Sequence, residues 1–120
     1  MSDELTANTG LEVQRQFDRR VPLLTPEAEL VIFRVAQEAL TNVTRHAKAR
    51  IVELSLLRLP SKVSLRVCDN GNGVSAGIVG AGIRGMRERA MLVGGQLSVG
   101  AGKQGGTEVR LDVPLDKAAR

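Results

Sequence analysis

The stretch that decides the fold is residues 25–47, which read TPEAELVIFRVAQEALTNVTRHA. Thr25 is a favourable N-cap residue, Pro26 suits the first helical position, and two glutamates follow in the first turn, where they complement the helix dipole. Apolar residues then recur at helical spacing from Ile32 onward. The stretch therefore predicts a long amphipathic helix that ends near Ala47.

Segments of alternating apolar and polar residues lie on both sides of this helix and predict strands. The expected strands cover residues 11–17, 52–56, 63–69, 97–99 and 109–113, and a second helix is expected over residues 83–93. Most of these strands pair as hairpins, and both helices are amphipathic. The pattern therefore predicts an α+β protein, a two-layer α/β sandwich whose mixed, mostly antiparallel sheet carries the helices on one face.

The chain has 120 residues and a net charge of +4, which suits a single domain over residues 1–120. We expect a core over about residues 11–115, with flexible ends at 1–10 and 116–120. No apolar run approaches the ~20 residues that span a bilayer, and we do not expect the polar start of the sequence to act as a signal peptide. Like charges are not clustered, and Trp and Tyr are absent, so no nucleic-acid partner is expected.

Four polar side chains lie four residues apart along the first helix, so they form one stripe: Arg34, Glu38, Asn42 and His46. A solvated helix face is the simplest explanation of such a stripe. However, Asn is a mediocre helix former and adds nothing to a solvated face. A carboxylate and an amide oxygen on adjacent turns also suit a hard cation such as Mg²⁺. The stripe is therefore a candidate binding surface.

Two polar residues share the inward parity of predicted strands. Asp69 continues the alternation of the 63–69 strand, and Thr107 shares the parity of Val109 and Leu111, so both should face the helix layer. A buried carboxylate is costly unless it is hydrogen-bonded, which makes Asp69 a candidate acceptor for a ligand amine. Ordinary turn chemistry is the alternative for the Asp-Asn-Gly sequence. Cys68, on the opposite parity, is expected to be a small outward hydrophobe.

Glycines are concentrated in the second half of the chain, with 12 of the 13 between Gly71 and Gly106. Those at residues 80–85 precede and open the second predicted helix, where backbone N–H groups can receive a phosphate. A flexible loop before a solvated basic turn is the alternative. The segment matches neither the Walker loop nor the dinucleotide fingerprint.

Four segments together resemble the ATP-binding catalytic domain of bacterial two-component sensor histidine kinases, of the GHKL superfamily. Residues 33–47 are similar to its N box, residues 69–73 and 80–90 to its two glycine boxes, and residues 105–107 to its closing threonine motif. The sequence looks most like the nitrate-sensor and desaturase-thermosensor subfamily. The resemblance implies the Bergerat-type ATP-binding fold.

The resemblance also implies a role for each matching residue. Asn42 would ligate Mg²⁺, and Glu38 would be the catalytic group near the γ-phosphate of ATP. Asp69 would accept a hydrogen bond from the adenine amine, with Thr107 supporting through water. The remaining ATP-binding residues implied by the match are Arg45, His46, Gly71, Gly73, Gly80, Gly82, Ile83, Arg84, Gly85 and Met86.

A domain of this kind would donate the γ-phosphoryl group of ATP to a histidine on a separate dimerisation domain, for relay to a response regulator. That histidine is not recognisable in residues 1–24, and His46 belongs to the N box. We therefore expect a cytoplasmic domain that is monomeric by itself, within a dimeric kinase. Three alternatives stay open: a serine kinase of anti-sigma-factor type or an ATPase with conformational output, a non-catalytic basic binding module, and a nucleotide binder without transfer activity.

Overall fold

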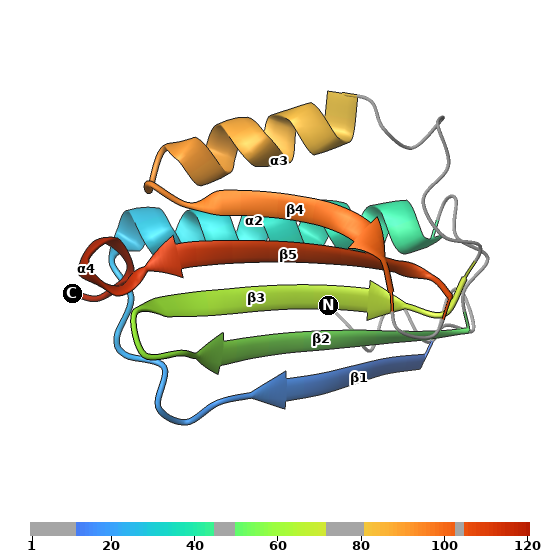
Figure 1. Cartoon of the computed structure of the whole chain (residues 1–120), viewed down its shortest axis with the longest axis horizontal. Helices are drawn as coiled ribbons and strands as arrows, with labels where there is room; N and C mark the ends of the chain where they lie inside the picture. Colours follow the sequence, from blue (N-terminus) through green and yellow to red (C-terminus); the bar gives the residue numbers. More distant parts are fainter. Residues whose placement is uncertain (1–11, 45–49, 72–80, 103–104) are drawn as a thin grey trace.

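A computed structural model describes residues 12–44, 50–71, 81–102 and 105–120, and every structural statement below concerns these residues. The described elements, in chain order, are β1 (Glu12–Phe17), α2 (Pro26–Asn42), β2 (Ile51–Arg58), β3 (Lys62–Asp69), α3 (Ala81–Met91), β4 (Gln96–Ala101), β5 (Thr107–Pro114) and α4 (Leu115–Ala118) (Figure 1). All the predicted strands and both predicted helices are present, with boundaries that differ by a few residues.

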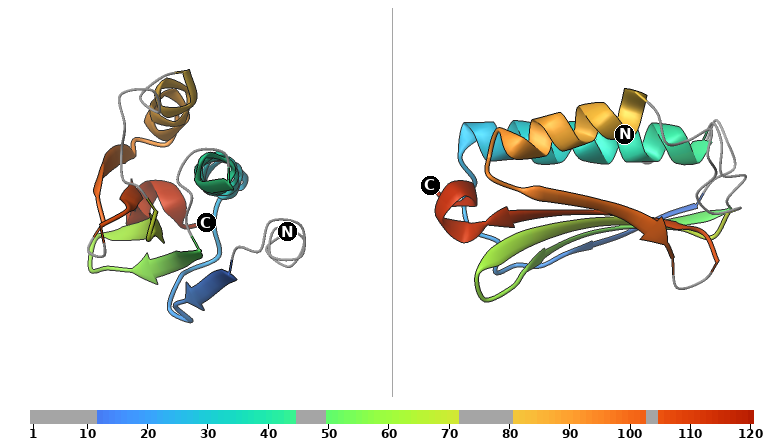
Figure 2. Two further views of the ribbon diagram at one scale, coloured as in Figure 1. Left: turned by 90° about the vertical axis from the view of Figure 1, so that its right-hand side faces the viewer. Right: turned by 45° about the horizontal axis from the view of Figure 1, so that its top comes forward.

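The strands form one five-stranded sheet in the order β1-β2-β3-β5-β4. β1 runs parallel to β2, and every other pair is antiparallel. The parallel arrangement of β1 and β2 follows from the segment that connects them. This segment contains α2, which returns the chain to the end of the sheet where β1 began, so β2 runs in the same direction. Both long helices lie on one face of the sheet (Figure 2). The predicted two-layer architecture is confirmed.

The start of α2 is set by the residues that the sequence suggested. The Thr25 hydroxyl accepts a hydrogen bond from the Ala28 amide (3.1 Å), and proline follows at the start of the helix. The regular helix ends at Asn42, five residues before the predicted end, and residues 43–44 form a wider turn. The last part of the predicted helix, residues 45–47, lies outside the described residues.

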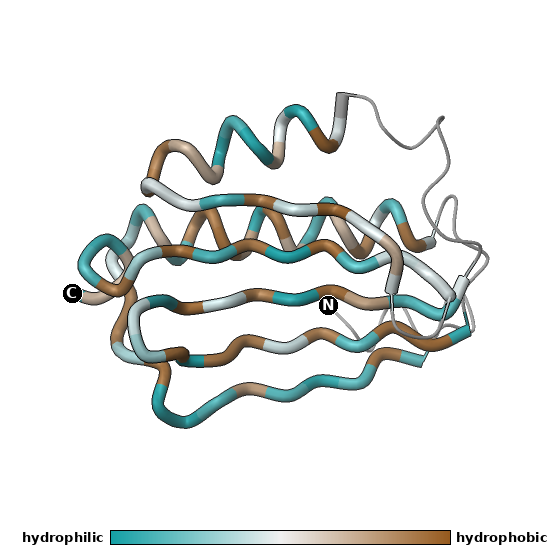
Figure 3. The backbone as a smooth tube through the Cα atoms, viewed as in Figure 1, coloured by the Kyte–Doolittle hydropathy of each residue, from teal (hydrophilic) through white to brown (hydrophobic). Residues whose placement is uncertain are grey.

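The core is made by rows of aliphatic side chains on the helix-facing side of the central strands. Leu65 pairs with Leu111 and Val67 with Val109 across β3 and β5, and these four residues are buried. The alternation of apolar and polar positions along each strand is visible in Figure 3. The buried face of α2 packs on β3 and β5 and against α3, so the middle of the sheet is the best-covered part of the protein.

The expectation of a flexible C-terminal end, residues 116–120, was wrong. Residues 115–118 form α4, and the Ala118 side chain is fully buried. The Arg120 amide donates to the Leu23 carbonyl (2.8 Å), and the Thr25 amide donates to the Ala118 carbonyl (2.8 Å). Backbone pairing and one small apolar side chain therefore hold a segment whose composition looks like a frayed end.

Among the described helices, none combines the length and the apolar composition needed to cross a bilayer.

Candidate functional site

Two buried polar residues lie side by side where β3 ends and β5 begins. Asp69 is only 6 % exposed and Thr107 only 8 %. Their neighbours Cys68 and Glu108 are directly paired in the sheet, which brings the two residues to the same edge. Both line a cavity between the sheet and the helices. The predicted inward orientation of both side chains is confirmed.

The hydrogen bonding of this pair leaves capacity for a ligand. Asp69 Oδ1 accepts a hydrogen bond from the Gly71 amide (2.8 Å). The Thr107 hydroxyl is buried and has no hydrogen-bond partner in the described part of the chain. Buried polar groups are normally paired, so an unpaired hydroxyl beside a buried carboxylate indicates a place where a ligand or a water molecule completes the bonding.

Gly106 packs closely against the backbone of Asp69. A Cβ atom at position 106 would collide with the carbonyl group of Asp69 and would lie 2.6 Å from its Oδ1. The contact is with main chain, so no rotation of a side chain could relieve it. Glycine at this position is therefore a condition for the close approach of β5 to the end of β3.

The polar stripe of α2 meets the beginning of α3. A Cβ atom at Gly82 would lie 2.6 Å from Glu38 Oε1 and 3.8 Å from Asn42 Nδ2. Glu38 and Asn42 are half-buried there, whereas Arg34, one turn earlier than Glu38, is exposed. The stripe is thus more than a solvated face, because Glu38 and Asn42 are half-buried and lie close to Gly82 of α3.

A hollow of about 470 Å³ separates the facing sides of the two helices. It is lined by Arg34, Gln37, Glu38, Thr41, Gly82, Gly85, Met86 and Arg89. The hollow is wide and polar, and two arginines contribute positive charge to it, as an anionic group such as a polyphosphate requires.

The cavity beside Asp69 is much narrower, at about 20 Å³, which is room for roughly one water molecule. It is lined by Ala39, Asn42, Val43, Val67, Asp69, Ile83, Met86, Val99, Thr107 and Val109. A purine ring is larger than this space. Binding of a base here requires the α3 side, with Ile83 and Met86, to move away from the sheet.

The oxygen atoms that α2 supplies fit a magnesium ion that takes most of its coordination shell from phosphates and water. Glu38 and Asn42 supply a carboxylate and an amide oxygen on adjacent turns, and both lie beside Gly82. No group of three or more His, Cys, Asp or Glu residues in the described ranges could form a complete metal cage. Mg²⁺ commonly takes one or two protein oxygens and completes its shell with phosphates and water.

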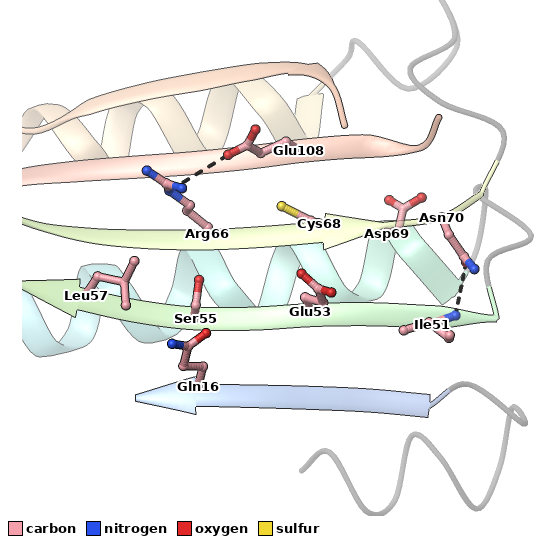
Figure 4. A pocket seen from close by; sticks show the side chains of 10 residues that line it. All are labelled: Gln16, Ile51, Glu53, Ser55, Leu57, Arg66, Cys68, Asp69, Asn70 and Glu108. Carbon is pink, nitrogen blue, oxygen red and sulfur yellow. Dashed lines mark hydrogen bonds and ion pairs between the residues drawn. The ribbon is translucent and has the colours of Figure 1, made fainter. Parts of the chain in front are cut away.

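Asn70 ties the end of β3 to the beginning of β2, a role that sequence reasoning missed. Its side-chain oxygen accepts hydrogen bonds from the Arg50 amide (2.9 Å) and the Ile51 amide (3.1 Å). Its own amide donates to the Ile51 carbonyl (3.2 Å). Figure 4 shows the contact between Asn70 and Ile51 at the beginning of β2. These three hydrogen bonds fix the position at which β2 begins.

The opposite face of the sheet carries a polar hollow that is separate from the cavity beside Thr107 (Figure 4). Arg66 and Glu108 form an ion pair across it, with 3.9 Å between Nε and Oε1. Cys68 lies there half-buried, on the outward side as predicted. Burial, and then the carboxylates of Glu108 and Glu53, raise the pKa of the Cys68 thiol.

The structure brings together some of the predicted site residues and leaves others outside. Glu38, Asn42, Asp69, Gly82, Ile83, Met86 and Thr107 line the narrow cavity, the hollow or their junction. Gly85 borders the hollow, Arg84 is exposed on α3, and Gly71 donates its amide to Asp69. Arg45, His46, Gly73 and Gly80 lie outside the described residues.

Comparison with known proteins identifies the class to which this fold and site belong. Residues 27–117 match the family described as histidine kinase-, DNA gyrase B- and HSP90-like ATPases, and the chain belongs to this family. It is 40 % identical to the sensor histidine kinase LiaS of Bacillus subtilis over 116 residues, and 36 % identical to the oxygen sensor histidine kinase NreB of Staphylococcus carnosus over 112 residues. These matches cover 94 % and 90 % of this chain but only 32 % of each relative, so the chain spans about a third of their length.

Solved structures support the same assignment. The histidine kinase domain of the blue-light activated histidine kinase EL346 from Erythrobacter litoralis superposes with a TM-score of 0.77 at 26 % identity, over 97 % of this chain and 58 % of that one. The ATP-binding domain of PrrB from Mycobacterium tuberculosis gives a TM-score of 0.68 at 25 % identity, over 93 % and 85 % of the two chains. The chain is therefore a GHKL-type ATPase domain of the kind found in sensor histidine kinases.

Proposed function

We propose that this chain is the Mg-ATP-binding catalytic domain of a sensor histidine kinase. It donates the γ-phosphoryl group of ATP to a histidine on a separate dimerisation domain, and a response regulator receives the group afterwards. In this proposal the domain is cytoplasmic and is monomeric by itself. The observation that carries it is the buried pair of Asp69 and the Thr107 hydroxyl, which has no partner among the described residues. The cavity that they line also contains Asn42, and it shares Met86 with the hollow that Glu38 lines.

In this proposal the adenine base is recognised at the end of the sheet. Asp69 Oδ1 already accepts the Gly71 amide, so Oδ2 is available to accept from the exocyclic amine of adenine. Thr107 completes the polar edge through its buried hydroxyl, and aliphatic side chains such as Val67 and Ile83 form the walls. An aspartate that only accepts selects adenine over guanine, because guanine presents a carbonyl oxygen at the corresponding position.

The phosphates then extend into the hollow between α2 and α3. Asn42 would hold Mg²⁺ there, and the bound ion would supply charge neutralisation for the phosphate oxygens. Arg34 and Arg89 add positive charge around the hollow. Glu38 would be the catalytic group near the γ-phosphate, where its carboxylate would accept a proton from the attacking imidazole. Phosphoryl transfer depends mainly on such positioning and charge neutralisation.

Nucleotide titration tests the binding half of the proposal. ATP with Mg²⁺ at 100 times its Kd should stabilise the fold by about 2.7 kcal/mol, which is roughly a 10 °C rise in Tm for a domain of this size. GTP should give a much smaller rise, and Asp69→Asn should abolish the rise with ATP. Ser98→Ala, on the exposed side of β4, is a matched control that should leave it intact. Equal stabilisation by ATP and GTP would contradict the assignment of Asp69.

Transfer from γ-³²P-labelled ATP tests the catalytic half. The acceptor is the part of LiaS outside the region that this chain matches, which under this proposal contains the phosphoaccepting histidine. The label should appear as acid-labile phosphohistidine and should depend on both proteins. Glu38→Gln should slow transfer while leaving the ATP-induced rise in Tm. An acid-stable label on serine would instead support the serine-kinase alternative.

A further inference from the structure

Two arginines, one from each long helix, border the hollow between α2 and α3. Arg34 lies on α2, one turn before Glu38, and Arg89 lies near the end of α3. The two helices run in opposite directions (Figure 1), and Gly82 at the start of α3 lies against Glu38 and Asn42. Both arginines are therefore toward the end of the hollow that is away from Gly82. We call Arg34 and Arg89 the arginine pair.

Helical spacing explains which arginine of α3 borders the hollow. Gly82, Gly85 and Arg89 follow one another at intervals of three and four residues, so they share one face of the helix. Arg84 and Arg87 are exposed on the same helix, but they do not line the hollow. A Cβ atom at Gly85 would meet nothing within 4 Å, so the face that leads to Arg89 has open space in front of it.

The charge of the arginine pair is not balanced by carboxylates in the described part of the chain. Glu38 is the one acidic side chain among the described residues that line the hollow, and neither arginine forms an ion pair with a described residue. Residues 45–49 and 72–80, which follow α2 and precede α3 in the sequence, contain no Asp or Glu. Two guanidinium groups that share a hollow repel each other, and an anion between them removes the repulsion. The arrangement therefore favours an anion with several charges.

We propose that the arginine pair contacts the γ-phosphate of ATP and is the feature by which this domain distinguishes ATP from ADP. This proposal rests on the function proposed above. Asp69 and Asn42 line the same narrow cavity, and Arg34 precedes Asn42 by eight residues, which is about 12 Å along α2. A nucleotide whose base is held at Asp69 extends its phosphates in this direction. The third phosphate is then the one nearest the extended arginine side chains.

The chemistry of arginine suits this role. Its planar guanidinium group donates two parallel hydrogen bonds to a pair of phosphate oxygens and keeps its charge at any physiological pH. After transfer of the γ-phosphoryl group, ADP keeps the contacts proposed for Asp69 and Asn42 but loses those of the arginine pair. The pair therefore weakens product binding relative to substrate binding, and it favours the replacement of ADP by ATP.

The test is calorimetric titration of the chain with ATP and with ADP, both in the presence of Mg²⁺. Arg34→Ala and Arg89→Ala should each weaken ATP binding at least tenfold and ADP binding less than twofold. The matched control is Arg87→Ala, which removes the same charge from α3 outside the hollow and should keep both affinities of the wild type. All three side chains are exposed, so Tm without nucleotide should stay near that of the wild type. If an alanine variant melts lower, the glutamine variant, which keeps part of the apolar stem, takes its place.

Three results would overturn the proposal while leaving the proposed function intact. Equal losses of ATP and ADP affinity would mean that the arginine pair acts on the first two phosphates. Wild-type affinity for ATP in both arginine variants would mean that the pair does not contact the nucleotide. An equal loss of ATP affinity in Arg87→Ala would assign the effect to the overall charge of α3. A wild-type chain that binds neither ATP nor ADP would instead reject the proposed function, and this inference with it.

Discussion

Replacing Gly106 with alanine should damage both the stability of the fold and nucleotide binding. The new Cβ would collide with the backbone carbonyl of Asp69 and approach its Oδ1 to 2.6 Å. The obstacle is main chain in a buried strand end, so β5 must move away from β3 to admit the methyl group. Such overpacking typically costs about 1–3 kcal/mol.

The size of the expected change in melting temperature follows from the length of the chain. Unfolding entropy of about 2.1 cal/mol/K per residue gives roughly 0.25 kcal/mol per degree for 120 residues, so Gly106→Ala should lower Tm by about 4–12 °C. Because the displaced atoms belong to Asp69, the variant should also lose most of the rise in Tm that ATP gives to the wild type.

Two neighbouring glycines provide controls for this experiment. Gly100→Ala meets no atom within 4 Å and should leave Tm within about 2 °C of the wild type. Gly105→Ala also meets no atom, but its φ of +88° adds backbone strain without touching Asp69, so it should lower Tm and keep ATP binding. If Gly106→Ala has the same Tm as Gly100→Ala and still binds ATP, the packing of Gly106 on Asp69 supports neither the fold nor the nucleotide site.

Three further predictions concern stability and reactivity. Hydrogen bonds from Arg20 hold the pKa of the Asp18 carboxyl well below its usual range. The stability contributed by Asp18 is therefore complete above about pH 4 and is lost as the pH falls from there toward the lowered pKa. Asp18→Asn should flatten the acid side of a Tm-versus-pH curve, and an unchanged curve would refute this. The raised pKa of Cys68 should shift its alkylation by iodoacetamide to higher pH than that of free cysteine; a profile matching the free thiol would contradict its burial. Thr25→Ala removes the hydroxyl that accepts from Ala28 and should cost about 1 kcal/mol in chemical denaturation, whereas Thr25→Ser should cost little.

Much of this fold could be predicted because its local signals agree. The cap at Thr25 and the alternating residues of β3 and β5 each specify one element, and their buried rows pair in register in the structure. The orientation of Asp69 and Thr107 followed from strand parity alone. The parity argument succeeds because a strand with one buried face cannot shift by a single residue without exposing its apolar side chains.

The features that were missed depend on contacts between distant segments. Ala118 gives no sign in the sequence that it will be buried, because its partners lie near Leu23 and Thr25. Asn70 looks like a turn residue, and the hydrogen bond that it accepts from the Ile51 amide forms only when β2 and β3 are side by side.

The hydrogen bonds that anchor the end of the chain near Leu23 determine where a label or tag attached after Arg120 would begin. Arg120 is hydrogen-bonded to Leu23, just before α2 begins, while Asn42 marks the other end of that helix. Seventeen residues of helix, about 25 Å, separate the two ends. A fluorescent label or affinity tag placed after Arg120 would therefore start at the far end of the domain from Asp69 and Asn42, and a donor dye there could report on acceptor-labelled ATP by distance without touching it.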